Sequence, residues 1–173
     1  MNDKKKGLGK IMKSKQEIFD SLITSELGML RAAAYRLLGD PVEVDDAVQE
    51  ALLTAWKKFD YFRHASKMST WLYRITMNVC CDRMRKRKRE SVKMKMFSQN
   101  VAAENDNSNP QLEQLSDAVQ ELPEPYRTSI LMVFFSSIDP ASVAAELKCS
   151  VNTLYQRIHK GKQLLKEKLQ VSA

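Results

Sequence analysis

The sequence contains few of the residues that stabilise small secreted or metal-binding proteins. Its 173 residues include three cysteines and two histidines; Cys80 and Cys81 are neighbours, and no Cys-x-x-Cys pair occurs. These counts argue against a disulfide scaffold and a structural zinc site, and they predict three reduced thiols and no metal or other cofactor. With only five glycines and five prolines, the chain is not collagen-like or of Gly/Pro low complexity.

Long apolar runs are also missing. No stretch approaches the ~20 apolar residues that a membrane-spanning helix requires, so direct insertion into a membrane is not expected. Residues 1–15 are basic, but they contain neither the apolar stretch nor the cleavage site of a signal peptide, which favours a cytoplasmic protein. Apolar residues still make up 43% of the chain, which is enough for a hydrophobic core.

The charged residues are segregated along the chain. There are 28 Lys and Arg residues against 21 Asp and Glu residues, a net charge of +7. Residues 83–95 hold eight basic residues and one acidic residue, whereas residues 96–126 hold six acidic residues and no basic one. A basic block of this density indicates a polyanionic partner, most often nucleic acid, although a solvated helix face can have the same composition.

Apolar residues recur every three to four positions through most of the chain, which predicts helices and no sheet. Gly39 ends the first helix, and Asp40 and Pro41 supply the N-cap and the first residue of the next one. Residues 60–69 break the periodicity and predict a loop. The expected helices cover residues 16–38, 41–59, 70 to the mid-90s, 111–121, 124–136, 140–147 and 151–168.

A polar, Asn-rich stretch over residues 98–110 predicts a linker. It separates a larger helical unit, 16–97, from a smaller one, 111–173. Residues 1–15 are expected to form a disordered basic extension. The predicted fold is therefore all-α, with two small helical domains joined by a flexible acidic linker.

The last two expected helices form a helix-turn-helix pattern. Asp139 caps the first of them, and Ser150 caps the second after a short turn. The polar side of the second helix carries Asn152, Gln156 and His159, and amide side chains suit the base edges of the DNA major groove. A polar helix face in an ordinary bundle would show the same pattern.

The third expected helix has two different faces. Leu72, Thr76 and Val79 lie on the side predicted to face the core, whereas four residues share the opposite, exposed side. These four are Arg74, Asn78, Cys81 and Arg85.

Three stretches resemble the extracytoplasmic-function (ECF) type of alternative sigma factor of bacterial RNA polymerase. Residues 37–59, LLGDPVEVDDAVQEALLTAWKKF, resemble the polymerase-binding helix of that family. Residues 69–90, STWLYRITMNVCCDRMRKRKRE, resemble its Thr-Trp-Leu helix with the basic cluster that follows. Residues 121–165, which begin ELPEPYRTSILMVF, resemble its C-terminal helix-turn-helix unit.

The resemblance implies partners and site residues. The partners are core RNA polymerase, promoter DNA and an anti-sigma factor, which is often anchored at the membrane; no small-molecule substrate is implied. Contacts to core polymerase are expected from Asp45, Asp46, Gln49 and Glu50. Contacts to the −10 promoter element are expected from Tyr61, Phe62, Arg63, Trp71, Arg74, Asn78, Arg83, Arg85 and Lys86. Contacts to the −35 element are expected from Arg127, Asn152, Thr153, Tyr155, Gln156, Arg157, His159 and Lys160.

Some of these assignments have structural alternatives. Carboxylates in the first turns of a helix are favourable without any partner. Trp71 could equally be a core residue. Arg157 lies nearer the buried side of its helix than the other −35 residues, which favours a phosphate contact or a structural role.

The chain departs from the family pattern inside the helix-turn-helix. Ser142 replaces a common Glu, which removes the usual reciprocal cap. Lys148 replaces a common Gly in the turn, so Lys148 is expected to adopt a strained backbone angle. Asn152 and Leu154 also replace commoner residues, and Met68 stands where an aromatic residue is common.

Other functions explain less of the sequence. A stand-alone helix-turn-helix regulator would explain residues 124–168 and the basic block, but not the Gln49/Glu50 face. An enzyme acting on nucleic acid would need a metal cluster or a phosphate-binding glycine loop, and the sequence has neither. An interaction protein with no DNA role is a fourth alternative. The sequence therefore predicts a non-enzymatic sigma factor.

Overall fold

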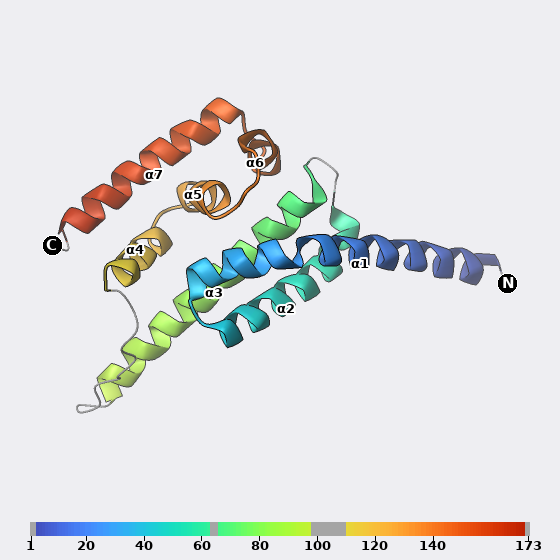
Figure 1. Ribbon diagram of the computed structural model, residues 1–173, viewed down its shortest axis with the longest axis horizontal. Coiled ribbons are helices and arrows are strands. Elements are labelled where there is room, and N and C mark those ends of the chain that lie inside the picture. Colours follow the sequence, from blue (N-terminus) through green and yellow to red (C-terminus); the bar gives the residue numbers. More distant parts are fainter. Residues whose placement is uncertain (1–2, 63–65, 98–109, 172–173) are drawn as a thin grey trace.

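The computed structural model describes the backbone over residues 3–62, 66–97 and 110–171, and the side chains over residues 15–62, 66–94 and 114–170. Within these ranges the chain is all-α, as predicted, and no residue lies in a strand (Figure 1). The helices are α1 (Asp3–Leu38), α2 (Pro41–Lys58), the short 3₁₀ helix η1 (Phe59–Tyr61), α3 (Met68–Phe97), α4 (Pro110–Gln120), α5 (Tyr126–Phe134), α6 (Pro140–Glu146) and α7 (Val151–Val171). No helix in the described part of the chain is long and apolar enough to cross a membrane.

Helices α1, α2 and α3 form the N-terminal unit, and each contributes one apolar stripe to its core. Leu30 and Ala34 of α1, Ala47 and Ala51 of α2, and Leu72 of α3 are all fully buried. The alanines allow the helices to approach closely, because a methyl group adds little width at the contact. The result is a tight three-helix packing.

The turn between α1 and α2 has the predicted caps. Gly39 adopts a positive φ of 74°, and its N–H donates to the Tyr35 carbonyl at 2.9 Å, which ends α1. The Asp40 carboxylate then accepts the N–H of Glu43 at 2.9 Å, which starts α2. This short turn makes α1 and α2 antiparallel neighbours.

Helix α1 is longer than the sequence predicts. It begins at Asp3, so the backbone of residues 3–15 is helical and not the expected disordered extension. The segment has no proline to break a helix. The Lys15 ammonium lies 2.8 Å from the Asp60 carboxylate and 4.8 Å from the centre of the Trp56 ring, so it attaches this part of α1 to the end of α2.

Helices α4 to α7 form the C-terminal unit, and α6 and α7 have the geometry of a helix-turn-helix. The Asp139 carboxylate accepts both the N–H and the hydroxyl of Ser142, at 2.8 and 2.7 Å, at the start of α6. The Ser150 hydroxyl accepts the Thr153 N–H at 3.0 Å at the start of α7. Between them, Lys148 has a φ of 50°, which confirms the expected strained turn.

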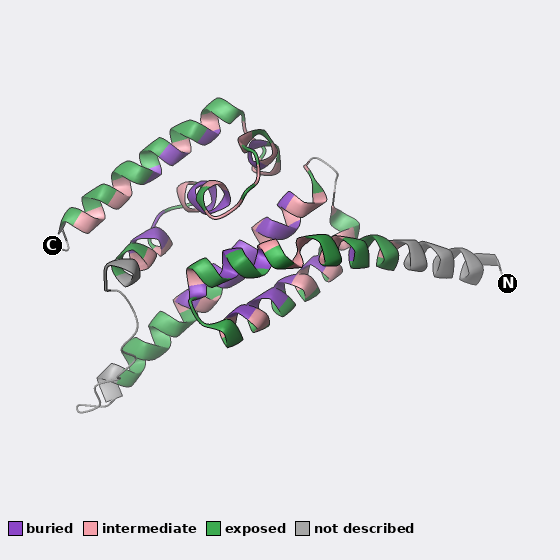
Figure 2. Ribbon diagram, in the orientation of Figure 1, coloured by how far each residue is buried: buried purple, intermediate pink, exposed green. Residues whose placement is uncertain are grey.

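The two units pack against each other and share one core. Met132, Val143, Leu154 and Ile158 of the C-terminal unit belong to the same buried cluster as the residues of α1 to α3. In Figure 2 the buried residues of α3 lie in its first part, between α1 and α2 and the C-terminal unit, and most of α7 is exposed. Residues 98–109, which include most of the expected linker, lie outside the described residues.

A second, smaller apolar cluster lies at the contact between the units. It joins Cys81 of α3 to Val119 of α4 and Leu131 of α5. Cys81 is therefore only 4% exposed. The prediction that Cys81 lies on an exposed helix face is wrong, because α4 and α5 cover that part of α3.

Candidate functional site

The first candidate site is the outer face of α2. Asp46, Gln49 and Glu50 are exposed there, because they alternate with the buried residues Val44, Ala47, Val48 and Ala51. The Asp45 carboxylate is half-buried and lies 2.7 Å from the Arg31 guanidinium of α1. The structure therefore brings three of the four predicted polymerase-binding residues together on one accessible surface and turns the fourth toward α1.

The exposed face of α2 also carries apolar side chains that sequence reasoning did not select. Val42 is 72% exposed and Leu53 is 62% exposed. Both share a helix face with Asp46 and Gln49 by their spacing. The outer face of α2 is therefore an acidic surface with Val42 near one end and Leu53 near the other.

Arg83 connects this acidic face to α3. Its Nε and Nη2 atoms lie 3.0 and 2.8 Å from the same Glu50 oxygen, and its Nη1 lies 3.8 Å from Asp46. The structure therefore places Arg83, predicted as a −10 contact, against two predicted polymerase contacts. Because all three side chains are partly exposed, the ion pairs are weak enough for a partner to replace them.

Aromatic side chains gather where η1 meets the start of α3. The Trp71 ring lies 5.2 Å from the Phe62 ring and 6.5 Å from the Phe59 ring, centre to centre. Trp71 is half-buried, so it has both a packing role and an accessible part. Tyr61 is 80% exposed beside them. Arg63, a predicted −10 contact, lies outside the described residues.

The remaining predicted −10 residues follow along α3. Asn78 is exposed. The Arg85 guanidinium pairs with Asp82 at 2.8 Å, and the Lys86 ammonium lies 3.9 Å from Glu90. These contacts lie within one helix and leave both basic groups at least partly exposed.

Arg74 is engaged by the other unit. Its guanidinium lies 3.2 Å from a Glu146 carboxylate oxygen and 3.4 Å from the Glu146 carbonyl oxygen. The Glu146 side chain is 9% exposed and also accepts the hydroxyl of Ser66. Nothing in the local sequence predicts this pair, because 72 residues separate its members.

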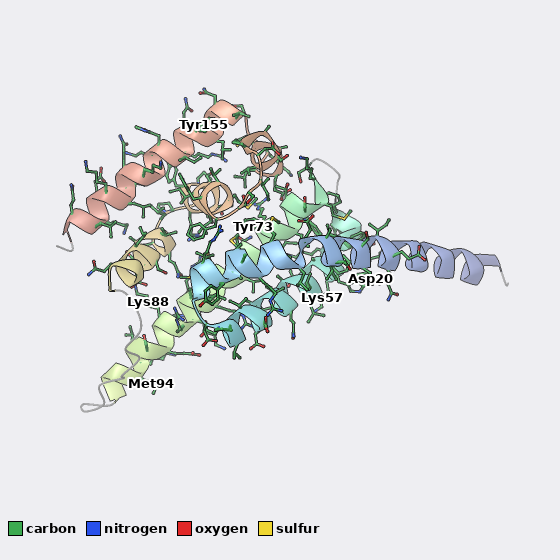
Figure 3. All side chains as sticks on the ribbon, in the orientation of Figure 1. Asp20, Lys57, Tyr73, Lys88, Met94 and Tyr155 are labelled. Carbon is green, nitrogen blue, oxygen red and sulfur yellow. The ribbon has the colours of Figure 1, made fainter. Side chains whose placement is uncertain are left out.

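The outer face of α7 is the third candidate site. Asn152, Tyr155, Gln156, His159 and Lys160 are exposed, while Leu154 and Ile158 are buried on the opposite side. Thr153 and Arg157 are half-buried between the two faces. In Figure 3, Tyr155 points away from the rest of the molecule. This face has the shape and the polar groups that a major-groove helix requires.

Arg127, the remaining predicted −35 residue, lies apart from α7's outer face. Its guanidinium donates to the carbonyl oxygens of Gln120 and Leu122 at 3.1 and 3.3 Å and pairs with Glu124 at 2.7 Å. Its side chain is 17% exposed. In this structure Arg127 holds the turn between α4 and α5.

The two neighbouring thiols of Cys80 and Cys81 are both buried. Burial raises the pKa of Cys80 to about 12 and that of Cys81 to about 11. Because the thiolate is the nucleophile, both groups are weakly reactive near neutral pH while they stay buried.

Comparison with known families fits this geometry. The Sigma-70 region 2 model matches residues 22–90, and the Sigma-70 region 4 model matches residues 112–165. The chain is 32% identical to the ECF RNA polymerase sigma factor SigW of Bacillus subtilis (strain 168), over 95% of this chain and 96% of that protein. The chain therefore belongs to the ECF family of RNA polymerase sigma factors, which bind core polymerase and promoter DNA.

Other relatives agree. The chain is 26% identical to the ECF RNA polymerase sigma-E factor of Escherichia coli (strain K12), over 93% of this chain and 91% of that protein. The sigma factor RpoE, solved with the anti-sigma factor NepR from Bartonella quintana, is 28% identical with a TM-score of 0.53, over 91% of this chain and 99% of that chain. CnrH, solved with the cytosolic domain of CnrY, shares the fold with a TM-score of 0.55, at 23% identity over 91% of each chain.

Proposed function

We propose that this ECF sigma factor binds core polymerase through the outer face of α2, reads the −10 element with the start of α3, and reads the −35 element with α7. The observation that carries this proposal is the separation of three accessible faces on two helical units, 16–97 and 111–173. Two DNA-reading units on one chain gain affinity from each other, because the binding of one raises the effective concentration of the second.

The α2 face supplies the polymerase contact. Asp46, Gln49 and Glu50 present carboxylate and amide oxygens, and Asp45 supports them from the α1 side. An acidic surface fits a basic helical partner, because charge complementarity steers the encounter and fixes the register. Val42 and Leu53 add the apolar contact that such an interface needs.

The −10 contact uses aromatic and basic groups. Promoter opening requires bases to leave the stack, and accessible aromatic rings such as Tyr61, Phe62 and Trp71 provide stacking surfaces for single strands. Arg63, Arg74, Asn78, Arg83, Arg85 and Lys86 supply hydrogen bonds and phosphate contacts. Because phosphate contacts release counterions, binding should weaken steeply with salt.

The −35 contact uses the outer face of α7. Asn152, Gln156 and His159 are placed for base edges, while Tyr155 and Lys160 flank them. Thr153 and Arg157, at the edge of this face, and Arg127, in the first turn of α5, would contact phosphates or support the unit.

Regulation by an anti-sigma factor in the cytoplasm is part of this proposal. The support is the co-crystal structure of the related RpoE with its anti-sigma factor NepR. The chain would contribute specificity and DNA opening, while polymerase supplies the catalytic chemistry. An anti-sigma factor anchored in the membrane would hold this chain at the inner face of the membrane.

The test combines a pull-down with transcription. Purified protein is incubated with bacterial core RNA polymerase, and transcripts made from genomic DNA are sequenced. Stoichiometric binding with discrete start sites is expected, and upstream of those sites the −10 and −35 sequences would be read directly. Binding without initiation would indicate a polymerase-associated regulator, and no binding would favour a stand-alone helix-turn-helix regulator.

A double variant tests separately whether the outer face of α2 binds core polymerase. Gln49→Ala combined with Glu50→Ala is expected to weaken core polymerase binding about tenfold, because it removes the centre of the contact. Circular dichroism should show unchanged helicity, since both residues are exposed. The matched control is Gln16→Ala with Glu17→Ala, an exposed Gln-Glu pair on α1. Equal polymerase affinity of the two double variants would contradict the assigned face.

A further inference from the structure

We infer that Glu146 of α6 is an autoinhibitory residue that holds the free chain closed by occupying Arg74. This inference rests on the proposed −10 function of Arg74. It concerns how that function is switched off inside the chain, before any partner is bound.

The contact combines charge, hydrogen bonding and burial. Arg74 reaches both a carboxylate oxygen and the backbone carbonyl oxygen of Glu146, at 3.2 and 3.4 Å. Ser66 donates its hydroxyl to the same carboxylate. With 9% exposure and two donors, Glu146 satisfies the charge of Arg74 much as a DNA phosphate would.

A second ion pair repeats the arrangement at the other end of α6. The Lys67 ammonium lies 3.3 Å from the Asp139 carboxylate, which is the N-cap of α6. Both acidic groups of this short helix-turn-helix segment thus meet basic groups at the start of α3. The first helix of the helix-turn-helix therefore lies against the start of α3, where it engages Arg74 of the proposed −10 surface.

The outer face of α7, the proposed −35 contact, is exposed while Glu146 pairs with Arg74. Asn152, Gln156, His159 and Lys160 are exposed on the side of α7 away from α3. The closed chain therefore engages Arg74 of the −10 surface and no residue of the outer face of α7. This asymmetry predicts that opening changes single-strand binding much more than duplex binding.

Cys81 reports on the closed state. Its thiol is buried against Val119 and Leu131 of the C-terminal unit, whereas the neighbouring Cys80 is fully buried in the main core, close to Glu50 of α2. Separation of the two units would expose Cys81 and leave Cys80 covered. Alkylation of the full-length protein, with each cysteine resolved by fragment-ion mass spectrometry, measures the two sites independently.

The test variant is Glu146→Gln, which keeps the shape and removes the charge. We expect the alkylation rate of Cys81 to rise about tenfold, because a hydrogen-bonded charge pair is lost, while the rate of Cys80 stays unchanged. The control is Glu167→Gln, which removes one exposed carboxylate from α7 and is expected to change neither rate. An unchanged Cys81 rate in Glu146→Gln would overturn the inference, and so would an equal rise at Cys80, which indicates general loosening.

Charge reversal provides a rescue. Glu146→Arg alone should expose Cys81, and the double variant Glu146→Arg with Arg74→Glu should protect it again, because the pair is restored with opposite polarity. Failure of the double variant to restore protection, when circular dichroism shows that it is folded, would overturn the pairing.

A single-strand DNA binding assay connects the Arg74–Glu146 contact to function. A fluorescein-labelled (dT)15 strand is expected to bind Glu146→Gln several-fold more tightly than wild type or Glu167→Gln, and a further Arg74→Ala change should remove the gain. Equal affinities would overturn the masking of Arg74. The polymerase pull-down separates the two proposals. If wild type binds polymerase but the Cys81 alkylation rate is unchanged in Glu146→Gln, only the autoinhibition is wrong. If the Cys81 rate rises in Glu146→Gln but wild type does not bind polymerase, only the proposed sigma-factor mechanism is wrong.

Discussion

At the scale of single residues, several side chains expected to bind partners already have partners within the chain. Arg74 pairs with Glu146, Arg83 with Glu50, and Arg127 with Glu124. The Arg83–Glu50 pair is partly exposed on both sides and contributes little to stability, whereas Glu146 and Arg127 are largely buried in their pairs. These arginines are therefore held in place before binding, and a partner must offer a better acceptor than the chain does.

Lys148 gives a prediction at this scale. Its φ of 50° costs a residue with a Cβ atom about 1 to 2 kcal/mol, and glycine avoids that cost while losing part of the gain to its freer unfolded state. Lys148→Gly is therefore expected to raise the free energy of unfolding by up to about 1 kcal/mol, measured by urea denaturation.

The matched control for that change is Lys148→Ala. It removes the same charged side chain but keeps the Cβ atom, so its stability should stay close to wild type. If Ala and Gly stabilise the protein equally, the backbone angle is not the cause.

At the scale of elements, the helix ends were the most predictable feature. Gly39, Asp40, Asp139 and Ser150 act where their short-range chemistry places them, because a cap depends on residues three or four positions away. The buried and exposed sides of α2 and α7 follow from periodicity for the same reason.

Contacts between distant segments were not predictable from the sequence. Cys81 occupies a position that helical spacing assigns to solvent, and its cover comes from Val119 and Leu131, roughly 40 to 50 residues away in the chain. The Arg74–Glu146 pair spans 72 residues. Local patterns identify which face of a helix is apolar or polar, but they carry no information on which polar face another unit will cover.

The N-cap of α6 gives a pH prediction. Hydrogen bonds from Ser142, with help from Lys67, lower the pKa of Asp139 to about 2. A carboxylate with a lowered pKa stabilises the fold above its unfolded pKa, and this stabilisation is lost as the pH falls through the folded value. The Asp139 side-chain carbon signal in nuclear magnetic resonance should therefore titrate with a midpoint near 2.

The variant that isolates this effect is Asp139→Asn. Asparagine keeps the cap but cannot ionise. The wild type should be more stable than the variant at pH 6, and the difference should shrink as the pH falls from about 4 toward 2. A difference that is independent of pH would show that the charge of Asp139 does not contribute.

At the scale of the whole molecule, two groups of ion pairs hold the units together. One is the contact of α6 with the start of α3. The other joins the Lys88 ammonium of α3 to Asp117 of α4 at 3.1 Å and to Glu121, just after α4, at 3.3 Å. Lys168 of α7 also lies 3.0 Å from Glu121. Hydrogen bonds from Lys168 and Lys88 lower the pKa of Glu121, so its carboxylate stays ionised at a lower pH than that of a free glutamate.

Removal of both groups should separate the units. Asp117→Asn with Glu121→Gln and Glu146→Gln in one chain is expected to increase the radius of gyration in small-angle X-ray scattering at 0.15 M salt. The chain with Glu167→Gln should keep the wild-type value. An unchanged radius in the combined variant would show that the apolar contacts between the units hold the closed state without these three carboxylates.

The length of α3 has a mechanical consequence. Fourteen residues separate Arg74 from Lys88, which is about 21 Å along a helix at a rise of about 1.5 Å per residue. Two contacts so far apart on one helix restrict rotation of the C-terminal unit. With only one of them in place, the C-terminal unit can rotate about that contact. Release at Arg74 would therefore let the C-terminal unit turn about the Lys88 contact, which moves α6 off the start of α3 and loosens the cover of Cys81 before the two units separate fully.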